Sequence, residues 1–170
     1  GSWSDDRGTN LLDTGAHFYD TYETSDGKWI SLGSIEPQFY AELRQRAGLT
    51  EDKDFDAQMD RKAWGPLKDK LTALFLTKTR DAWCALMEMT DVCFAPVLSM
   101  AEAPLHPHNV ERRTFLDIDG VIQPAPAPRY SATVTDTPVM TRATSTDAVL
   151  ADFGVDAAAI AGLRAAGAIA

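Results

Sequence analysis

The sequence has little of what marks a metal-binding, secreted or membrane protein. It holds two cysteines, Cys84 and Cys93, and three histidines in 170 residues. The cysteine spacing does not match a zinc site, and no apolar run approaches the ~18 residues that a membrane span requires. The first residues carry no basic segment followed by an apolar stretch, so no secretory signal is visible. We therefore expect a cytoplasmic protein without a bound metal.

Both cysteines lie in apolar stretches of the sequence. Two buried thiols in a reducing compartment are the favoured interpretation, and a disulfide between Cys84 and Cys93 is the alternative.

Basic residues are also scarce. The chain has 16 Lys and Arg against 25 Asp and Glu, which gives a formal net charge of −9. An acidic chain repels phosphate backbones, so nucleic-acid binding is disfavoured as the main role. The net value still leaves room for a local basic patch that binds a phosphorylated ligand.

Common catalytic motifs are absent as well. The sequence has no glycine-rich phosphate loop, nucleophile elbow or metal-ligand cluster, and it contains no internal repeat. Its hydrophobic content of 45% is ordinary for a globular protein that buries a core. Composition therefore predicts a folded domain but names no reaction.

The first two thirds of the chain predict an α+β unit, from about residue 15 to about residue 112. Residues 17–23 and 28–33 form a predicted hairpin with an Asp-Gly turn at its tip. Pro37 suits the first position of a helix, which Glu36 precedes as the cap residue and Gly48 ends.

The same unit is expected to contain two more helices and one more strand. Residues 50–60 are polar and acidic and are expected to form a loop. A helix begins between residues 62 and 66, and Thr79 caps the next one. Residues 92–95 are predicted to be a short buried strand.

The remaining residues, 113–170, are rich in proline and alanine and predict a linker arm followed by short helices. A second hairpin is expected at 115–122, an extended arm at 129–145, and two helices capped by Asp147 and Asp156. Such a segment must bury its apolar faces against something else. At the other end, residues 1–14 predict an incoming linker in which Gly1 and Ser2 look like a cloning remnant.

Six short strings stand out along the chain: LDTGAHFY at 12–19, YETSDG at 22–27, IEPQFY at 35–40, TDVCFAPV at 90–97, PAPRYS at 126–131 and VLADFG at 149–154. In this order they resemble α-methylacyl-CoA racemases of the family III CoA-transferase superfamily. The last string resembles the terminal helix of the wider superfamily. Thr14 and His17 depart from the pattern, which has glycine and proline there.

The resemblance implies a fold. Such enzymes are interlocked homodimers in which each chain has a large Rossmann-like domain and a smaller α+β domain. The strings match the second half of these enzymes. The chain is therefore expected to hold the small domain at residues 15–112 and, at 113–170, the linker and segment that return to the large domain.

The resemblance also implies a catalytic residue. Inverting the carbon next to a thioester carbonyl requires one group to remove a proton and another to deliver one on the opposite face. In the family a histidine and an aspartate of the N-terminal half do this, and the glutamate of the IEPQF string supports the histidine. That glutamate is Glu36 here. The alternative is that Glu36 is merely a helix cap, where the helix dipole also favours a carboxylate.

For several other residues, a structural interpretation is favoured over a functional one. His106 and His108 suggest a metal or catalytic site, but their proline neighbours favour a solvated loop. Asp91 near a helix end favours a local hydrogen bond. Arg129 suggests a contact with a CoA phosphate, although a surface or interface ion pair is favoured. Packing is expected for His17, predicted on a strand, and for the tryptophans Trp29, Trp64 and Trp83.

Three functions remain open. The first is a racemase acting on 2-methylacyl-CoA thioesters in fatty acid metabolism, with no separate cofactor because CoA is part of the substrate. The second is a CoA transferase that works through an aspartyl thioester, and the third is an interaction or dimerisation domain without catalysis. The IEPQF string favours the first, and the chain by itself is expected to be inactive.

Overall fold

The computed structural model describes residues 3–139 and 145–169. The chain divides into two units, Gly1–Met100 and Ala101–Ala170, here called the N-terminal and C-terminal units. The division after Met100 comes earlier than the boundary expected near residue 112, and the assignment of segments to domains of a longer protein stays a prediction. The expected cloning remnant at residues 1–2 and part of the expected arm, at 140–144, lie outside the described residues.

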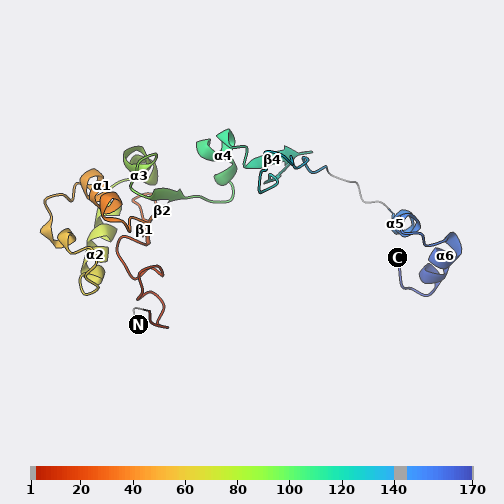
Figure 1. Cartoon of the computed structure of the whole chain (residues 1–170), viewed down its shortest axis with the longest axis horizontal. Helices are drawn as coiled ribbons and strands as arrows, with labels where there is room; N and C mark the ends of the chain where they lie inside the picture. The colour runs from red at the N-terminus through yellow and green to blue at the C-terminus, as the bar shows by residue number, and fades with distance from the viewer. Residues whose placement is uncertain (1–2, 140–144, 170) are drawn as a thin grey trace. The chain divides into compact units, whose positions relative to one another are not determined.

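A three-stranded antiparallel sheet organises the N-terminal unit (Figure 1). Its strands are β1 (Thr21–Glu23), β2 (Trp29–Leu32) and β3 (Phe94–Val97), and β2 lies in the middle. The predicted hairpin is confirmed, because β1 and β2 pair across a turn in which Gly27 has a φ of 70°, a conformation that glycine adopts easily.

The outer strands differ from the prediction. Residues 17–20 turn before β1 begins, because the Tyr19 amide donates to the Ala16 carbonyl at 3.0 Å. Instead of a buried strand at 92–95, the structure has a half-exposed strand at 94–97, on the edge of the sheet. An edge position tolerates Pro96, which has no N–H to donate.

Three helices accompany the sheet, all near the predicted positions (Figure 1). They are α1 (Pro37–Ala47), α2 (Trp64–Phe75) and α3 (Arg80–Met87). Gly48 ends α1 in the left-handed conformation, with a φ of 75°. The Thr79 hydroxyl accepts a hydrogen bond from the Ala82 amide at the start of α3, as predicted for the cap.

The inner face of the sheet and the apolar faces of the helices form one core. Trp83 is 1% exposed, and its indole N–H donates to the Phe75 carbonyl at 2.9 Å. Trp64 is also buried, but Trp29 is 44% exposed, so the expectation that it packs in the core is wrong. The alternation along β2 explains this, since Ile30 and Leu32 take the inner face and Trp29 the outer one.

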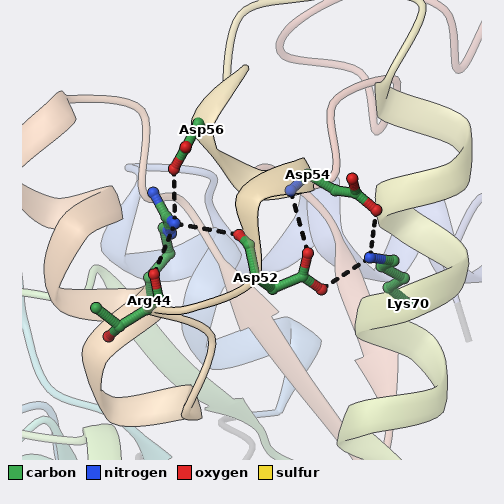
Figure 2. Close-up of polar contacts among 6 residues, drawn as sticks. Arg44, Asp52, Asp54, Asp56 and Lys70 are labelled. Carbon is green, nitrogen blue, oxygen red and sulfur yellow. Dashed lines mark hydrogen bonds and ion pairs between the residues drawn. The ribbon is translucent and has the colours of Figure 1, made fainter.

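Residues 50–60 are not a simple loop, because they contain a 3₁₀-helix, η1 (Lys53–Asp56), that buries Phe55. Charged side chains of α1 and α2 hold η1 (Figure 2). The Arg44 guanidinium contacts Asp56 at 2.9 Å, and the Lys70 ammonium bridges the carboxylates of Asp52 and Asp54 at 2.7 and 2.5 Å. Single surface ion pairs contribute little, but these ones join three segments around a buried ring.

His17 is a packing residue, as predicted, although it precedes the strand. The ring is fully buried, lies near Phe18, Tyr40 and Phe55, and has Nε2 2.7 Å from the Tyr40 hydroxyl. Its Nδ1 has no hydrogen-bond partner within the described residues. Burial, and then the positive charge of Lys68, lowers the pKa of His17 to about 4, so the ring is neutral at pH 7.

The C-terminal unit contains less regular structure. The predicted hairpin is confirmed by β4 (Phe115–Ile118) and β5 (Val121–Pro124), with Asp119 and Gly120 both at positive φ in the turn. The other elements are η2 (Ala103–Leu105), α4 (Pro107–Glu111), α5 (Thr146–Asp152) and α6 (Ala157–Ala165).

Of the two caps predicted for the last two helices, one is confirmed and one is wrong. Asp156 caps α6 as predicted, by accepting from the Ala159 amide at 2.8 Å. Ser145, rather than Asp147, caps α5, because Asp147 lies in its first turn and pairs with Arg164 at 2.5 Å.

The molecule is a mixed α+β protein with small antiparallel sheets, which confirms the predicted class. Among the described residues of the C-terminal unit, Ile118 and Ile160 are the buried hydrophobic side chains, so this unit has little core. Within the described part of the chain, every helix is too short or too polar to cross a membrane.

The neutral, buried state of His17 predicts a pH-dependent stability. Its pKa is about 4 in the folded chain and near 6.5 in the unfolded one, so unfolding takes up a proton between these values. The free energy of unfolding should therefore fall by up to about 3 kcal/mol as the pH drops from about 6.5 to about 4. Urea unfolding at a series of pH values measures this slope.

His17→Gln removes the titrating group, so its unfolding free energy should vary less over that pH interval. Equal slopes in the two proteins would show that His17 does not cause the pH dependence of the free energy of unfolding.

Candidate functional site

Glu36, the predicted catalytic residue, stands at the start of α1, directly before Pro37. Its backbone is extended and its carbonyl accepts from the Tyr40 amide at 3.0 Å, which begins the helix. The side chain is exposed and makes no capping hydrogen bond. The carboxylate is therefore available to another group, while the positive end of α1 favours its negative charge.

The segment before Glu36 is fixed on two sides. On one side, the buried Ser34 hydroxyl donates to the Val92 carbonyl at 2.5 Å, and the Gly33 amide donates to the Cys93 carbonyl at 2.9 Å. On the other side, the Gln58 amide group donates to the carbonyls of Ser34 and Ile35, at 3.1 and 2.8 Å. Glu36 thus projects from a backbone that its neighbours hold in place.

A hollow of about 390 Å³ lies next to this segment. It opens between the end of β2, the residues before β1 and the start of β3. Tyr19, Leu32, Gly33, Cys93 and Phe94 are among the residues that line it, and the lining is mostly apolar. Its surface suits an apolar group better than a charged one.

Cys93 is exposed, so the expectation of a buried thiol is wrong for this residue. Its φ of 57° places it in a turn that leads into β3. Partial burial of the sulfur, and then the carboxylates of Glu36 and Asp91, raises the pKa of the thiol. Cys93 is thus a neutral thiol at pH 7. Cys84 is partly buried, and both cysteines are free, so the alternative of a disulfide is wrong.

The other residues singled out from the sequence lie in varied local settings within their own units. Asp91 is exposed beside Cys93. His106 precedes α4 and His108 is an exposed residue within it, so the predicted loop is a short helix. Arg129 is exposed and donates to the Arg113 carbonyl at 2.6 Å, and it forms no surface ion pair among the described residues. Among the described residues, no three His, Cys, Asp or Glu side chains are placed to hold a metal ion.

Sequence reasoning missed the residues that support the site. Gln58 lies in the polar stretch predicted to be a loop, and nothing in the sequence marks its contact with Ser34. Tyr19 and Cys93 lie in strings that resemble the racemases, and this was the available signal that they line the same hollow.

Comparison with known proteins places these features in a family. The profile described as "CoA-transferase family III" matches residues 3–146. The α-methylacyl-CoA racemase of Mus musculus is 44% identical over 134 residues, which cover 78% of this chain and 35% of the relative. That of Homo sapiens is 42% identical over 127 residues, with 74% and 33% covered. The chain thus spans about a third of the length of these relatives.

The chain is also similar in fold to solved structures. The crystal structure of Rv3272 from Mycobacterium tuberculosis matches with a TM-score of 0.57 and 22% sequence identity. The match covers 72% of this chain and 36% of that one. At this identity the likeness supports the fold and says nothing of a shared activity.

The contacts around Glu36 predict how two substitutions change stability. Glu36→Gln should lower the free energy of unfolding by less than ~1 kcal/mol, because only the interaction with the helix dipole is lost. Ser34→Ala should cost more, about 1–3 kcal/mol, because the buried Val92 carbonyl loses its donor. Urea unfolding of the two variants measures both values.

A Glu36→Gln loss as large as that of Ser34→Ala would mean that the carboxylate has a structural role after all.

Proposed function

The chain belongs to CoA-transferase family III, and from that premise we propose that it forms part of an α-methylacyl-CoA racemase. The observation that carries the proposal is Glu36, an exposed carboxylate with no capping bond, on a fixed backbone and within the IEPQFY string. The identity of 42–44% to proteins named α-methylacyl-CoA racemase supports this choice within the family.

The proposed reaction inverts the carbon next to the thioester carbonyl of a 2-methylacyl-CoA. One group breaks the C–H bond and takes the proton, the electron pair moves onto the carbonyl oxygen, and a second group returns a proton to the opposite face. By the resemblance, a histidine and an aspartate of the N-terminal half fill these roles. Glu36 would accept a hydrogen bond from the histidine and stabilise its positive charge after proton removal.

The hollow next to the segment that precedes Glu36 fits this proposal. Its mostly apolar lining suits an acyl chain, and it adjoins the segment that carries the carboxylate. The raised pKa of Cys93 argues against a thiolate nucleophile there, because the neutral thiol attacks carbonyls poorly.

A CoA transferase is the second candidate, favoured by the description of the matching family. Such an enzyme would form an aspartyl thioester and pass CoA to a second acid, whereas the racemase exchanges the α-proton without releasing CoA. A relative of Caenorhabditis elegans described as a CaiB/baiF CoA-transferase family protein is 30% identical over 111 residues, less than the racemases. The greater similarity supports the racemase.

Four further features belong to the proposal. The complete enzyme would be an interlocked homodimer, act in fatty acid metabolism and need no separate cofactor, because CoA is part of its substrate. A cytoplasmic location agrees with two free thiols, which a reducing compartment preserves.

Replacing Glu36 in the full-length enzyme tests the proposal. Glu36→Gln keeps the size of the side chain but removes the charge that stabilises the protonated histidine. We expect kcat to fall by about tenfold to a thousandfold with little change in KM, because the lost interaction is strongest as charge develops. The measurement is α-proton exchange of a 2-methylacyl-CoA in deuterated water.

Glu42→Gln is the matched control, since Glu42 lies on the same helix and pairs with Arg46 on the surface. Normal turnover of Glu36→Gln would reduce Glu36 to a helix-terminal residue, and CoA transfer without α-proton exchange would favour the second candidate.

The 170-residue chain alone should not catalyse the exchange. The proposed acid–base pair lies outside the strings that this chain matches, so Glu36 would have no histidine to support. Incubating the purified chain with a 2-methylacyl-CoA in deuterated water should leave the α-proton in place. Exchange that disappears in Glu36→Gln would overturn this expectation and move the acid–base chemistry into this chain.

A further inference from the structure

Three arginines gather around a hollow of the C-terminal unit, in an otherwise acidic chain. The hollow has a volume of about 600 Å³ and is lined by His108, Glu111, Arg112, Arg113 and Arg129. None of the three arginine side chains forms an ion pair within the described residues, and Glu111 is the one carboxylate of the lining. Like charges repel, so such a group without matching carboxylates is suited to an anion.

The backbone holds the arginines together. Arg113 follows α4 with a φ of 51°, at the position where helices usually end in glycine. The Thr114 amide donates to the Asn109 carbonyl at 2.9 Å, which completes this turn. The carbonyl of Arg113 accepts from the Arg129 guanidinium at 2.6 Å, so the arm is joined to the end of α4.

A second hollow shares two of these arginines. It has a volume of about 300 Å³, and its lining includes Arg113 and Arg129 together with Leu116, Pro126 and Tyr130. Tyr130 is 58% exposed. An exposed aromatic ring beside apolar side chains offers a stacking surface for a planar ring.

We propose that these two hollows form a binding site for a nucleoside phosphate. The guanidinium groups of Arg112, Arg113 and Arg129 bind the phosphate groups, and the base stacks on Tyr130. Guanidinium is suited to phosphate because its planar N–H groups make paired, charge-assisted hydrogen bonds. The site does not include Glu36 and does not depend on the proposed racemase activity.

A structural role explains the arginines less well. A positive charge at the end of α4 is favourable, because the helix dipole is negative there. That effect accounts for Arg112 and Arg113 but not for Arg129, which comes from the arm, 16 residues beyond Arg113. It also leaves the exposed Tyr130 beside them unexplained.

Calorimetric titration of the 170-residue chain with adenosine 3′,5′-bisphosphate tests the site. We expect a Kd below about 1 mM at low ionic strength, weakening as salt is added. Arg129→Gln and Arg112→Gln should each weaken binding about tenfold or more, because each removes a charge-assisted contact. Titrations with CoA and with ADP then distinguish a CoA thioester from a free nucleotide as the source of the ligand.

Two controls separate the site from general charge effects. Arg164→Gln removes an equal charge from the same unit, at a surface pair with Asp147, and should bind as the unchanged chain does. Tyr130→Leu should weaken binding of the bisphosphate but not of pyrophosphate, which has no base. Absence of binding would overturn the proposal, and so would an equal loss of affinity in Arg164→Gln, Arg112→Gln and Arg129→Gln. If Tyr130→Leu weakened the binding of the bisphosphate and of pyrophosphate equally, the stacking contact would be overturned.

Discussion

The buried hydrogen bond from the Ser34 hydroxyl to the Val92 carbonyl is central to the placement of Glu36. It joins residues 58 positions apart in the sequence and ties the end of β2 to the segment that leads into β3. An unpaired buried carbonyl is costly, so this contact fixes how the two segments meet. The chain then has to turn at Gly33–Ile35 and enter α1 with Glu36 at its exposed end.

The charged residues around η1 support the same segment from the other side. Arg44 and Lys70 hold Asp52, Asp54 and Asp56, and this fixes the 3₁₀-helix over the core. Gln58 follows two residues after the end of η1, and its backbone carbonyl accepts from the Trp64 indole at 2.9 Å. Its side chain is thereby directed at the carbonyls of Ser34 and Ile35. The ion pairs thus hold the segment that leads to Gln58, and Gln58 contacts the backbone before Glu36.

Local signals in the sequence predicted the elements, while contacts between distant residues could not be predicted. The Asp-Gly turn, Pro37, Gly48, Thr79 and Asp156 identified a hairpin and helix ends, because each acts on its own neighbours. Phe55 and Gln58 were missed because their roles depend on residues of α1, α2 and the Gly33–Ile35 segment. Trp29 was misplaced because composition does not tell which face of a strand meets the core. Glu36 is proposed through resemblance alone, since a glutamate before proline looks the same whether or not it caps a helix.

The acidic net charge matters for the binding of an extended ligand, whereas the cluster of arginines matters for a small one. At physiological salt, charges more than about 8 Å apart are largely screened, so a net charge of −9 spread over the chain acts on a ligand only through the charged residues near it. It opposes binding to an extended polyanion, which would span many acidic positions. A single phosphate group within reach of Arg112, Arg113 and Arg129 interacts chiefly with those three. The same composition that disfavours nucleic acid is therefore compatible with a small phosphorylated ligand, and the local arrangement of charge decides between them.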